Sequence, residues 1–375
     1  MDFTLTDEQT LLRDTTRELL GRSYDAEKRN QTTQSELGWS KDVWGKLAEI
    51  GLLGLSFSEE DGGMDAGPVE TMAVLIEVGR RLAPEPILDA VLLPGGLIAE
   101  AGSADQRKKI LPQLAEGATL LAFAHIESGV RWPSSDITTT ATQQGDSWTL
   151  SGTKNPVLHG GTADTLVVSA TLPSGGIGLF LVEADASGVT RTPFNTYDGL
   201  RGAQVTLDNA AAEPLGDGGD ATELVNAAIV RAQAALCAEA VGAMEEALRL
   251  TTEYLKTRKQ FGVPLAKFQT LTQRAADMYV SLEAARSLNV YLTMSLADGN
   301  ADPIIASRAK LQIGRSARHI GQEAVQLHGG IGMTAEYPVG HYLSRLTAID
   351  HTFGSADDHL RVLADNVGSY SKVEL

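Results

Sequence analysis

The spacing of apolar residues divides the 375-residue chain into three parts. Up to about residue 118, apolar positions recur every three or four residues, as on the buried face of an amphipathic helix. From about Leu120 the chain changes to short β-branched runs broken by Gly, Asp, Ser and Pro, which predict strands and turns. After the stretch EPLGDGGDAT, helical spacing returns and lasts to the end. The pattern predicts an α+β fold with domains at residues 1–118, 119–218 and 219–375.

Local signals mark helix boundaries in the first part. Thr6 and Gln9 have the spacing of a capping box, and Gly21 is placed to stop the helix that follows. A second capping box at Ser103 opens a helix that Pro112 should end or kink. We therefore expect a domain built mainly from capped helices.

The middle part predicts hairpins and the last part predicts a bundle. We expect one hairpin in DITTTATQQGDSWTLSG, a second in ADTLVVSATLPSGGIGLFLVEA, and further strands in GVTRTPFN and AQVTLDNAAAE. The three long helical segments after residue 219 are rich in Ala. Helices of that kind pack against each other and against copies from other chains.

The acidic composition limits the partners of the chain. Its 31 Lys and Arg against 48 Asp and Glu give a formal net charge of −17, which disfavours nucleic acid and anionic membrane surfaces. The N-terminal segment lacks a secretory pattern, and no later stretch has roughly 18 uncharged apolar residues. Cys237 is the only cysteine, and the histidines show no HExxH spacing, so we expect no metal site. We expect a cytoplasmic protein with no nucleic-acid or membrane partner.

Three strings in the last third carry candidate chemistry. RKQFGVPLAKFQTLTQRAADM begins at Arg258, QLHGGIGMTAEYPV at Gln326 and FGSADDHL at Phe353. An arginine at a helix end is a bidentate donor for phosphate, and the paired glycines of the second string let backbone approach a flat or anionic ligand. Taken singly, each string also fits a surface arginine or a helix cap.

Taken together and in this order, the strings resemble the acyl-CoA dehydrogenase family. The resemblance spans essentially the whole chain, because the DGG at Asp61–Gly63, the LAFAHIE strand and the LSGTK hairpin also fit. It implies an N-terminal helical domain, a middle β-sandwich-like domain and a C-terminal four-helix-bundle domain. It also implies FAD bound at a subunit interface of a tetramer.

The reaction implied by the resemblance is α,β-dehydrogenation of an acyl-CoA thioester. A carboxylate removes the α-proton while hydride leaves the β-carbon for the flavin, and electron-transferring flavoprotein is the expected acceptor. The carboxylate base is missing from this sequence. Phe353 stands at the usual glutamate, and Ala232, followed by Gln233, stands at the alternative position on the long helix. Asp350 or Glu239 could serve as a relocated carboxylate.

The resemblance also divides the flavin contacts into lost and retained ones. Ile126 stands where the family has a threonine that bonds the flavin, in the longer loop IESGVRWPSSD, and Pro156 and Leu158 replace a tryptophan and a threonine that contact the ring system. By contrast, the residues that in the family reach the FAD of the neighbouring chain are retained: Arg258, Gln260, Phe261, Gln326, Gly329 and Gly330.

This asymmetry favours a subunit without its own base that completes the FAD site of a homologous catalytic partner. Such a division resembles the subunit lacking the catalytic glutamate in actinobacterial heterotetrameric (α2β2) acyl-CoA dehydrogenases of steroid degradation. Two alternatives stay open. One is a self-sufficient homotetrameric dehydrogenase or oxidase with a relocated base, and the other is a non-enzymatic acyl-CoA or acyl-carrier binding protein.

Overall fold

The computed structural model describes residues 4–129, 132 and 136–369. The chain forms two compact units, each built from more than one segment. The first comprises Met1–Arg29, Pro68–Ala83 and Gln233–Leu375, and the second comprises Asn30–Gly67 and Pro84–Ala232. Helices α2 and α7 therefore contribute residues to both units.

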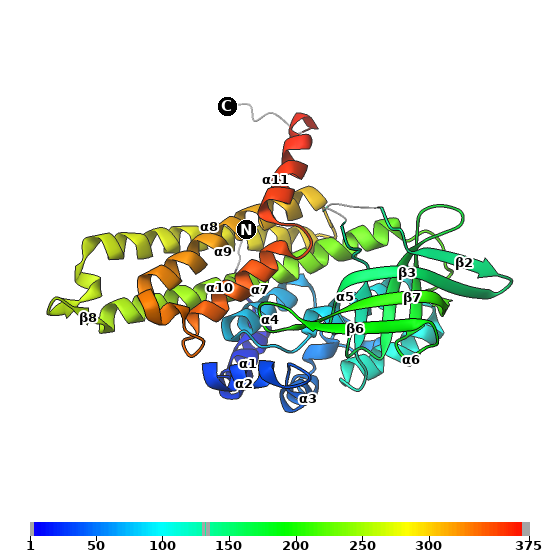
Figure 1. Cartoon of the computed structure of the whole chain (residues 1–375), viewed down its shortest axis with the longest axis horizontal. Coiled ribbons are helices and arrows are strands. Elements are labelled where there is room, and N and C mark those ends of the chain that lie inside the picture. The colour runs from blue at the N-terminus through cyan, green and yellow to red at the C-terminus, as the bar shows by residue number, and fades with distance from the viewer. Residues whose placement is uncertain (1–3, 130–131, 133–135, 370–375) are drawn as a thin grey trace. The chain divides into compact units, whose positions relative to one another are not determined.

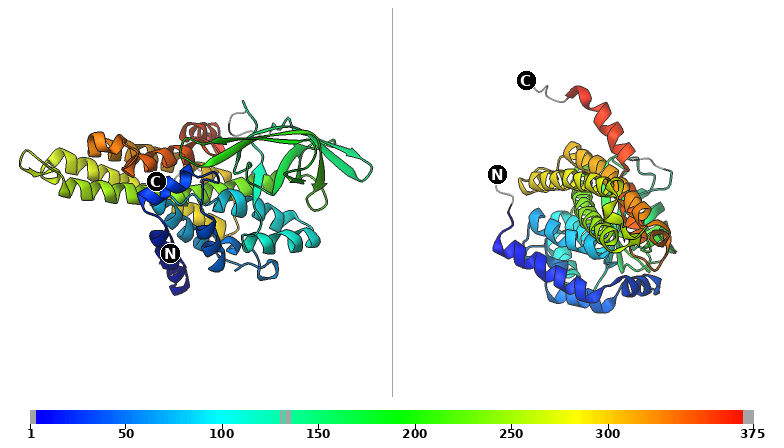
Figure 2. Two further views of the ribbon diagram at one scale, coloured as in Figure 1. Left: turned by 60° about the horizontal axis from the view of Figure 1, so that its bottom comes forward. Right: turned by 90° about the vertical axis from the view of Figure 1, so that its left-hand side faces the viewer.

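The first unit is mainly helical. Its elements are α1 (Asp7–Ser23), α2 (Ala26–Gln34, shared), α4 (Pro68–Arg81), α7 (Thr222–Thr257, shared), β8 (Lys259–Gln260), β9 (Val263–Pro264), η4 (Leu265–Lys267), α8 (Gln269–Ala297), α9 (Pro303–His328), η5 (Gly329–Met333), α10 (Val339–His351), α11 (Ala356–Asp365) and η6 (Val367–Ser369). Helix α9 packs against α8, α10 and α11, and α4 packs against α1 and α8 (Figure 1). The turned views of Figure 2 show α8 and α9 running side by side.

Both predicted capping boxes are confirmed. The Thr6 side chain accepts from the Gln9 backbone N–H at the start of α1, and the Gln9 side chain accepts from the Thr6 N–H. Ser103 and Gln106 make the same pair of bonds at the start of α6 (Ala104–Ala115). These local bonds satisfy backbone donors that have no partner inside the helix.

The helix end predicted at Gly21 is wrong, and of the two outcomes predicted for Pro112 the helix end is not observed. Gly21 does not stop α1, which runs on to Ser23. A glycine stops a helix by adopting a left-handed conformation, and Gly21 keeps helical backbone beside the guanidinium of Arg81. Pro112 does not end α6, which continues to Ala115. Pro112 has no backbone N–H, so the last turn of α6 forms without one backbone hydrogen bond.

Glycines let α4 and α7 approach closely within the first unit. A Cβ on Gly79 would lie 1.9 Å from the carbonyl oxygen of Glu239, and a Cβ on Gly242 would lie 1.8 Å from that of Ile76. Real Cβ atoms do not come that close to backbone oxygens. Any larger residue at either position would therefore push the two helices apart.

The second unit joins short helices to a seven-stranded sheet. Its other elements are α3 (Lys41–Glu49), η1 (Leu52–Gly54), η2 (Glu59–Asp61), the π-helix η3 (Ile87–Leu92), α5 (Leu93–Ala101), α6, β1 (Leu121–Ala124), β2 (Thr140–Gln144), β3 (Ser147–Leu158), β4 (Thr165–Thr171), β5 (Ile177–Glu183), β6 (Val189–Asn195) and β7 (Arg201–Pro214). The two predicted hairpins are confirmed as the antiparallel pairs β2–β3 and β4–β5.

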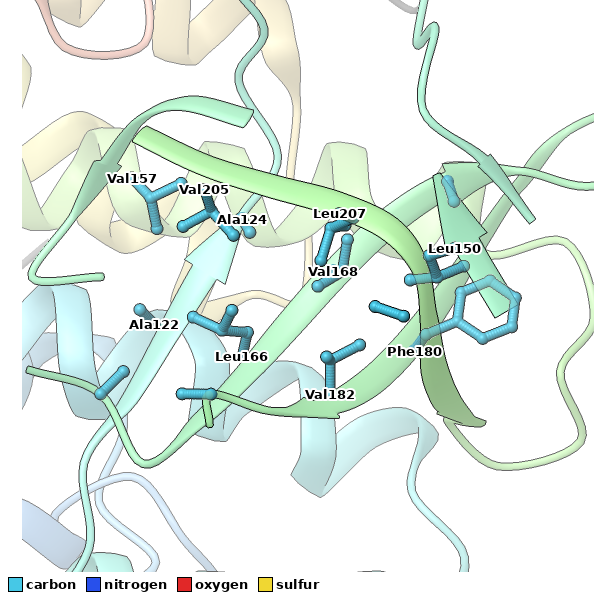
Figure 3. Close-up of a cluster of buried hydrophobic side chains, with 14 of the residues drawn as sticks. Ala122, Ala124, Leu150, Val157, Leu166, Val168, Phe180, Val182, Val205 and Leu207 are labelled. Carbon is cyan, nitrogen blue, oxygen red and sulfur yellow. The ribbon is translucent and has the colours of Figure 1, made fainter. Parts of the chain in front are cut away.

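The strand pairing closes the sheet on itself. The order is β1-β4-β2-β3-β7-β5, with β6 beside β7, and β4 also pairs with β5. The apolar core lies among the strands and is made by the cluster shown in Figure 3, in which Leu166 and Val168 of β4 lie among side chains of β1, β3, β5 and β7. The fold class expected from the sequence, a β-sandwich-like middle between helical regions, is confirmed.

Helix α7 is apolar as well as long. By length and composition it could cross a membrane, with a mean hydropathy of 1.4 over its most apolar window. However, 78% of that window is buried inside the chain. Burial of this kind is what the core helix of a bundle shows.

Candidate functional site

The loop between α10 and α11 holds Phe353 in a defined position. The side chain is buried, with 7% exposed, and the backbone is left-handed at φ +53°, a conformation that bulky residues rarely adopt. The Phe353 carbonyl oxygen accepts hydrogen bonds from Gln233 Nε2 at 2.9 Å and from His359 Nε2 at 3.0 Å. These two donors offset the strain of the loop.

His359 is a neutral donor in this arrangement. Because the Phe353 carbonyl only accepts, the proton of His359 lies on Nε2, and Nδ1 accepts from Ser307 Oγ at 3.1 Å. Burial, followed by the nearby charge of Lys310, lowers the pKa of His359 to about 4. The imidazole is therefore uncharged at neutral pH and supports the loop without adding charge to it.

Lys310 of α9 caps the end of α10. Its Nζ donates to the carbonyl oxygens of Ile349 (2.6 Å), Asp350 (3.3 Å) and Thr352 (2.9 Å). These carbonyls at the end of the helix need donors from outside it. Burial lowers the pKa of Lys310 to about 8, so the side chain is still protonated at neutral pH.

Asp350 is held as part of the same loop. Its Oδ1 accepts from the Ala356 N–H at 3.0 Å, and Oδ2 lies 3.8 Å from Arg318. A Cβ on Gly314 would lie only 2.1 Å from Oδ1, so the carboxylate fills the space beside that glycine. Asp350 is buried and already bonded at the start of α11.

Glu239 is likewise engaged. It forms a two-pronged ion pair with Arg345 of α10, with distances of 2.6 and 2.8 Å, and both side chains are largely buried. The carboxylates of Glu239 and Asp350 thus both already have partners within the chain. A general base needs a lone pair directed at the substrate proton, and in both residues it is directed at a protein donor.

The retained residues Arg258, Gln260 and Phe261 lie together beyond the end of α7. Arg258 follows the last helical residue, and the short hairpin β8–β9 presents Phe261 at its turn. Phe261 is 92% exposed with φ +52°, and its ring lies edge-on to Phe268 at 6.1 Å. An aromatic side chain held out in this way has one face free for a flat partner.

The second retained group lies at the end of α9. Gln326, Gly329 and Gly330 are exposed, and a Cβ on either glycine would meet open space. The buried His328 ring packs on Tyr254 of α7 at 4.5 Å and on Tyr337 at 4.9 Å. These contacts join the ends of α7 and α9.

The residues that stand at the lost flavin contacts lie on the sheet of the second unit. Ile126 is half-buried, and its carbonyl accepts from the Asn155 N–H at 2.8 Å, which places it beside Pro156. Pro156 is exposed and Leu158 is half-buried. None of these three side chains donates a hydrogen bond. Residues 130–131 and 133–135 of the loop IESGVRWPSSD lie outside the described residues.

An ion pair lies directly beneath this surface. The Glu127 carboxylate accepts from Lys154 Nζ at 2.8 Å and from the hydroxyls of Thr138 (2.5 Å) and Thr139 (2.6 Å). Burial acts to raise the pKa of Glu127, but these donors outweigh it and lower the pKa to about 2. The buried pair is charged and bonded within the chain, so it is a structural support of the segment after β1 that carries Ile126.

Three models of the acyl-CoA dehydrogenase family match the chain. The N-terminal domain model matches residues 6–118, the middle domain model residues 122–210 and the C-terminal domain model residues 222–368. The chain belongs to the acyl-CoA dehydrogenase family. Its members are FAD-dependent oxidoreductases.

Known members resemble the chain along its whole length. The short-chain specific acyl-CoA dehydrogenase of Clostridium acetobutylicum is 30% identical over 354 residues, which cover 90% of this chain and 92% of that protein. The solved structure of a variant of the Tcur3481-Tcur3483 steroid ACAD is 34% identical with a TM-score of 0.89, covering 98% of this chain and 99% of that one. The ChsE4-ChsE5 complex of Mycobacterium tuberculosis is 26% identical with a TM-score of 0.91, covering 99% and 100%.

As a member of the acyl-CoA dehydrogenase family, the chain presents groups that fit FAD beyond the ends of α7 and α9. The exposed Arg258, Phe261 and glycine pair offer a cation, a ring and open backbone, which suit a phosphate and a flat ring system. The side chains of Ile126, Pro156 and Leu158 offer FAD neither a hydrogen-bond donor nor an aromatic ring. The pattern predicted from the sequence is therefore consistent with the geometry, while the role of each residue stays a prediction.

The sequence does not predict two of the residues that hold the Phe353 loop, Gln233 and His359. In the sequence, Gln233 stands out only as the neighbour of Ala232, and nothing distinguishes His359 from the other histidines. Their contacts with the Phe353 carbonyl join residues 120 and 6 positions apart, and no local pattern signals them. Among residues 4–129, 132 and 136–369, no group of three or more His, Cys, Asp or Glu is placed to hold a metal ion.

Proposed function

We propose that this chain is the subunit of a heteromeric acyl-CoA dehydrogenase that lacks the catalytic base. In this role it completes the FAD site of a homologous, base-carrying partner. The assembled enzyme oxidises the α,β bond of an acyl-CoA thioester, and the chain alone is inactive. We place the assembly in the cytoplasm, as an α2β2 tetramer that passes electrons to electron-transferring flavoprotein.

The observation that carries this proposal is the loop at Phe353. The base position holds a buried phenyl ring, and its carbonyl is fixed by Gln233 and His359. The two nearby carboxylates, Asp350 and Glu239, are already bonded within the chain. Proton removal from the α-carbon therefore needs a carboxylate from another polypeptide.

The role of the chain toward FAD follows from its exposed residues. Arg258 would hold a phosphate of the cofactor, Phe261 would cover a ring, and the backbone at Gly329 and Gly330 would approach it closely. FAD, when bound, supplies the acceptor for the hydride. These residues bind and orient the cofactor from outside the pocket that contains its reactive ring.

The substrate class and the partner rest on similarity. One solved relative is described as a steroid ACAD containing Tcur3481 and Tcur3483, and another as a complex of ChsE4 and ChsE5. We infer that this chain also pairs with a homologous chain and that the complex acts on a CoA ester derived from a steroid. Lipid or steroid catabolism is the corresponding setting.

Co-expression with a homologous, base-carrying chain tests the proposal. We expect dehydrogenation of acyl-CoA, measured with an artificial electron acceptor, only when both chains are present. In the complex, Arg258→Ala should weaken FAD binding roughly tenfold, because it removes a charge-assisted contact. Arg22→Ala is the matched control, since Arg22 pairs with Glu18 on the exposed side of α1.

The same complex distinguishes the alternative with a relocated base. Loss of a general base costs about 10²–10⁴-fold in rate. Asp350→Asn and Glu239→Gln should each leave the turnover of folded complex within a few fold of the original. A drop of that size in either variant, or turnover by this chain alone, would overturn the proposal in favour of a self-sufficient enzyme. Thioester binding without flavin in every assembly would instead favour a non-enzymatic binding protein.

A further inference from the structure

We propose that a cavity in the first unit, away from the Phe353 loop, binds a small organic anion through a phosphate or carboxylate group. The cavity has a volume of about 200 Å³ and lies where the end of α1, the start of α2, the end of α4, the second half of α7 and the start of α10 meet. All of its lining residues belong to the first unit. None of them was singled out in the sequence.

The lining is basic in a chain that is otherwise strongly acidic. Three arginines, Arg29, Arg81 and Arg249, face the cavity, against the carboxylates of Asp25 and Glu246. The overall net charge of −17 makes such a concentration of guanidinium groups unexpected on composition alone. Guanidinium forks match phosphate and carboxylate oxygens in geometry as well as charge.

Most of the charged groups in the lining are already engaged. Arg249 forms a two-pronged pair with Glu246 and a further bond to Glu253 at 2.6 Å. Arg29 Nε donates to the Leu82 carbonyl at 3.1 Å. Asp25 caps α2 by accepting from the Lys28 N–H at 2.8 Å. Each carboxylate thus has a partner of its own.

Arg81 differs from the others. Within the described part of the chain its side chain makes no hydrogen bond or ion pair, although its Nε is buried. The guanidinium lies over Gly21, 3.4 Å from where a Cβ would be, so α1 leaves room for it. Arg81 also lines the cavity, so an oxyanion bound there would supply its guanidinium with the acceptor that it lacks among the described residues.

The rest of the lining suits the body of a small organic molecule. Leu82, Leu250, Pro338 and the Tyr342 ring give apolar surface. The Tyr342 hydroxyl is turned away to donate to the Arg80 carbonyl at 2.6 Å. A mixed lining with a few charged groups is typical of metabolite pockets. An occupant would bridge helices from both ends of the chain and so stabilise the first unit.

Calorimetric titration of the full chain with pyrophosphate and, separately, with succinate at low ionic strength tests this proposal. We expect saturable binding of at least one of the two probes, and the tighter one identifies the preferred oxyanion. Arg81→Gln should weaken that binding about tenfold, and Arg81→Lys should weaken it less because it keeps the charge. Arg22→Gln, on an exposed arginine of α1 outside the cavity, is the control and should leave binding unchanged.

A second measurement guards against a folding defect in the variants. Pyrophosphate or succinate should raise the midpoint of thermal unfolding of the original chain, and this rise should disappear in Arg81→Gln while the unliganded midpoint stays similar. No saturable binding of either probe to the folded chain, or equal binding by Arg81→Gln, would overturn the proposal. Neither result depends on a partner chain, flavin or dehydrogenase activity, so it is separate from the test of the proposed function.

Discussion

The Gln233 side-chain amide donates a 2.9 Å hydrogen bond to the carbonyl oxygen of Phe353. By resemblance to the family, we predict that Ala232, which precedes Gln233 on α7, stands at the alternative base position and that Phe353, after α10, stands at the usual one. The bond therefore ties together the two places where the acyl-CoA dehydrogenase family carries its carboxylate. In this chain both places serve to hold a loop, and neither offers a proton acceptor.

Removing this bond should destabilise the helical unit. Gln233→Ala removes one of the donors that hold the buried Phe353 carbonyl, and we expect a loss of about 1–2 kcal/mol in the free energy of unfolding. Urea unfolding followed by far-UV circular dichroism measures the loss. Gln322→Ala, at an exposed position of α9, is the control and should have little effect. Equal stability of the two variants would show that the bond contributes nothing.

Acid should weaken the fold through buried neutral histidines. The pKa of His359 falls from an ordinary 6.5 to about 4 in the folded chain. Between these values the unfolded chain binds a proton that the folded chain does not, so stability falls as the pH decreases from 6.5 to 4. The loss approaches about 3 kcal/mol for a shift of this size.

His125, in the second unit, acts in the same direction. Burial, with the charge of Lys154, lowers its pKa to about 4. The test is the difference in unfolding free energy between pH 7 and pH 5, measured by far-UV circular dichroism. His359→Gln keeps a donor for the Phe353 carbonyl but does not titrate, so its pH dependence should be smaller. An unchanged pH dependence in that variant would contradict the assignment.

Restoring a carboxylate at the base position should not make the chain self-sufficient. In Phe353→Glu the new side chain enters a buried site, and Ile126 and Pro156 still have no side-chain donor to offer a flavin. We expect the purified variant to show no turnover with an artificial electron acceptor and added FAD. Measurable acyl-CoA oxidation by this variant without a partner would show that the chain's own flavin pocket works.

The sequence predicted those features that local chemistry decides. Capping boxes such as Thr6–Gln9 place bonding groups three residues apart, and the alternating and β-branched runs of the middle part set the hairpins. The prediction for Gly21 failed because a glycine also serves where a neighbouring side chain needs space, here that of Arg81. Which role applies depends on tertiary contacts.

The contacts that hold the Phe353 loop in place could not be predicted from local sequence patterns. Lys310 lies about 40 positions before the carbonyls it caps, and a lysine at that spacing from a helix end carries no local signal. The same holds for Arg81, which has no partner among the described residues and whose surroundings come from five helices. The absence of a base at Phe353 was visible in the sequence only through resemblance to the family. Only the structure shows that the carboxylates of Asp350 and Glu239 are already bonded within the chain.

The flavin content of the chain purified alone tests the central claim most directly. It is measured from flavin absorbance relative to protein, before and after co-purification with a homologous, base-carrying chain. We predict almost no FAD on the chain alone and one FAD per pair of chains in the complex, because this chain holds the cofactor only from outside. One FAD per chain in the isolated protein would contradict the account and point to a complete flavin site within copies of this chain.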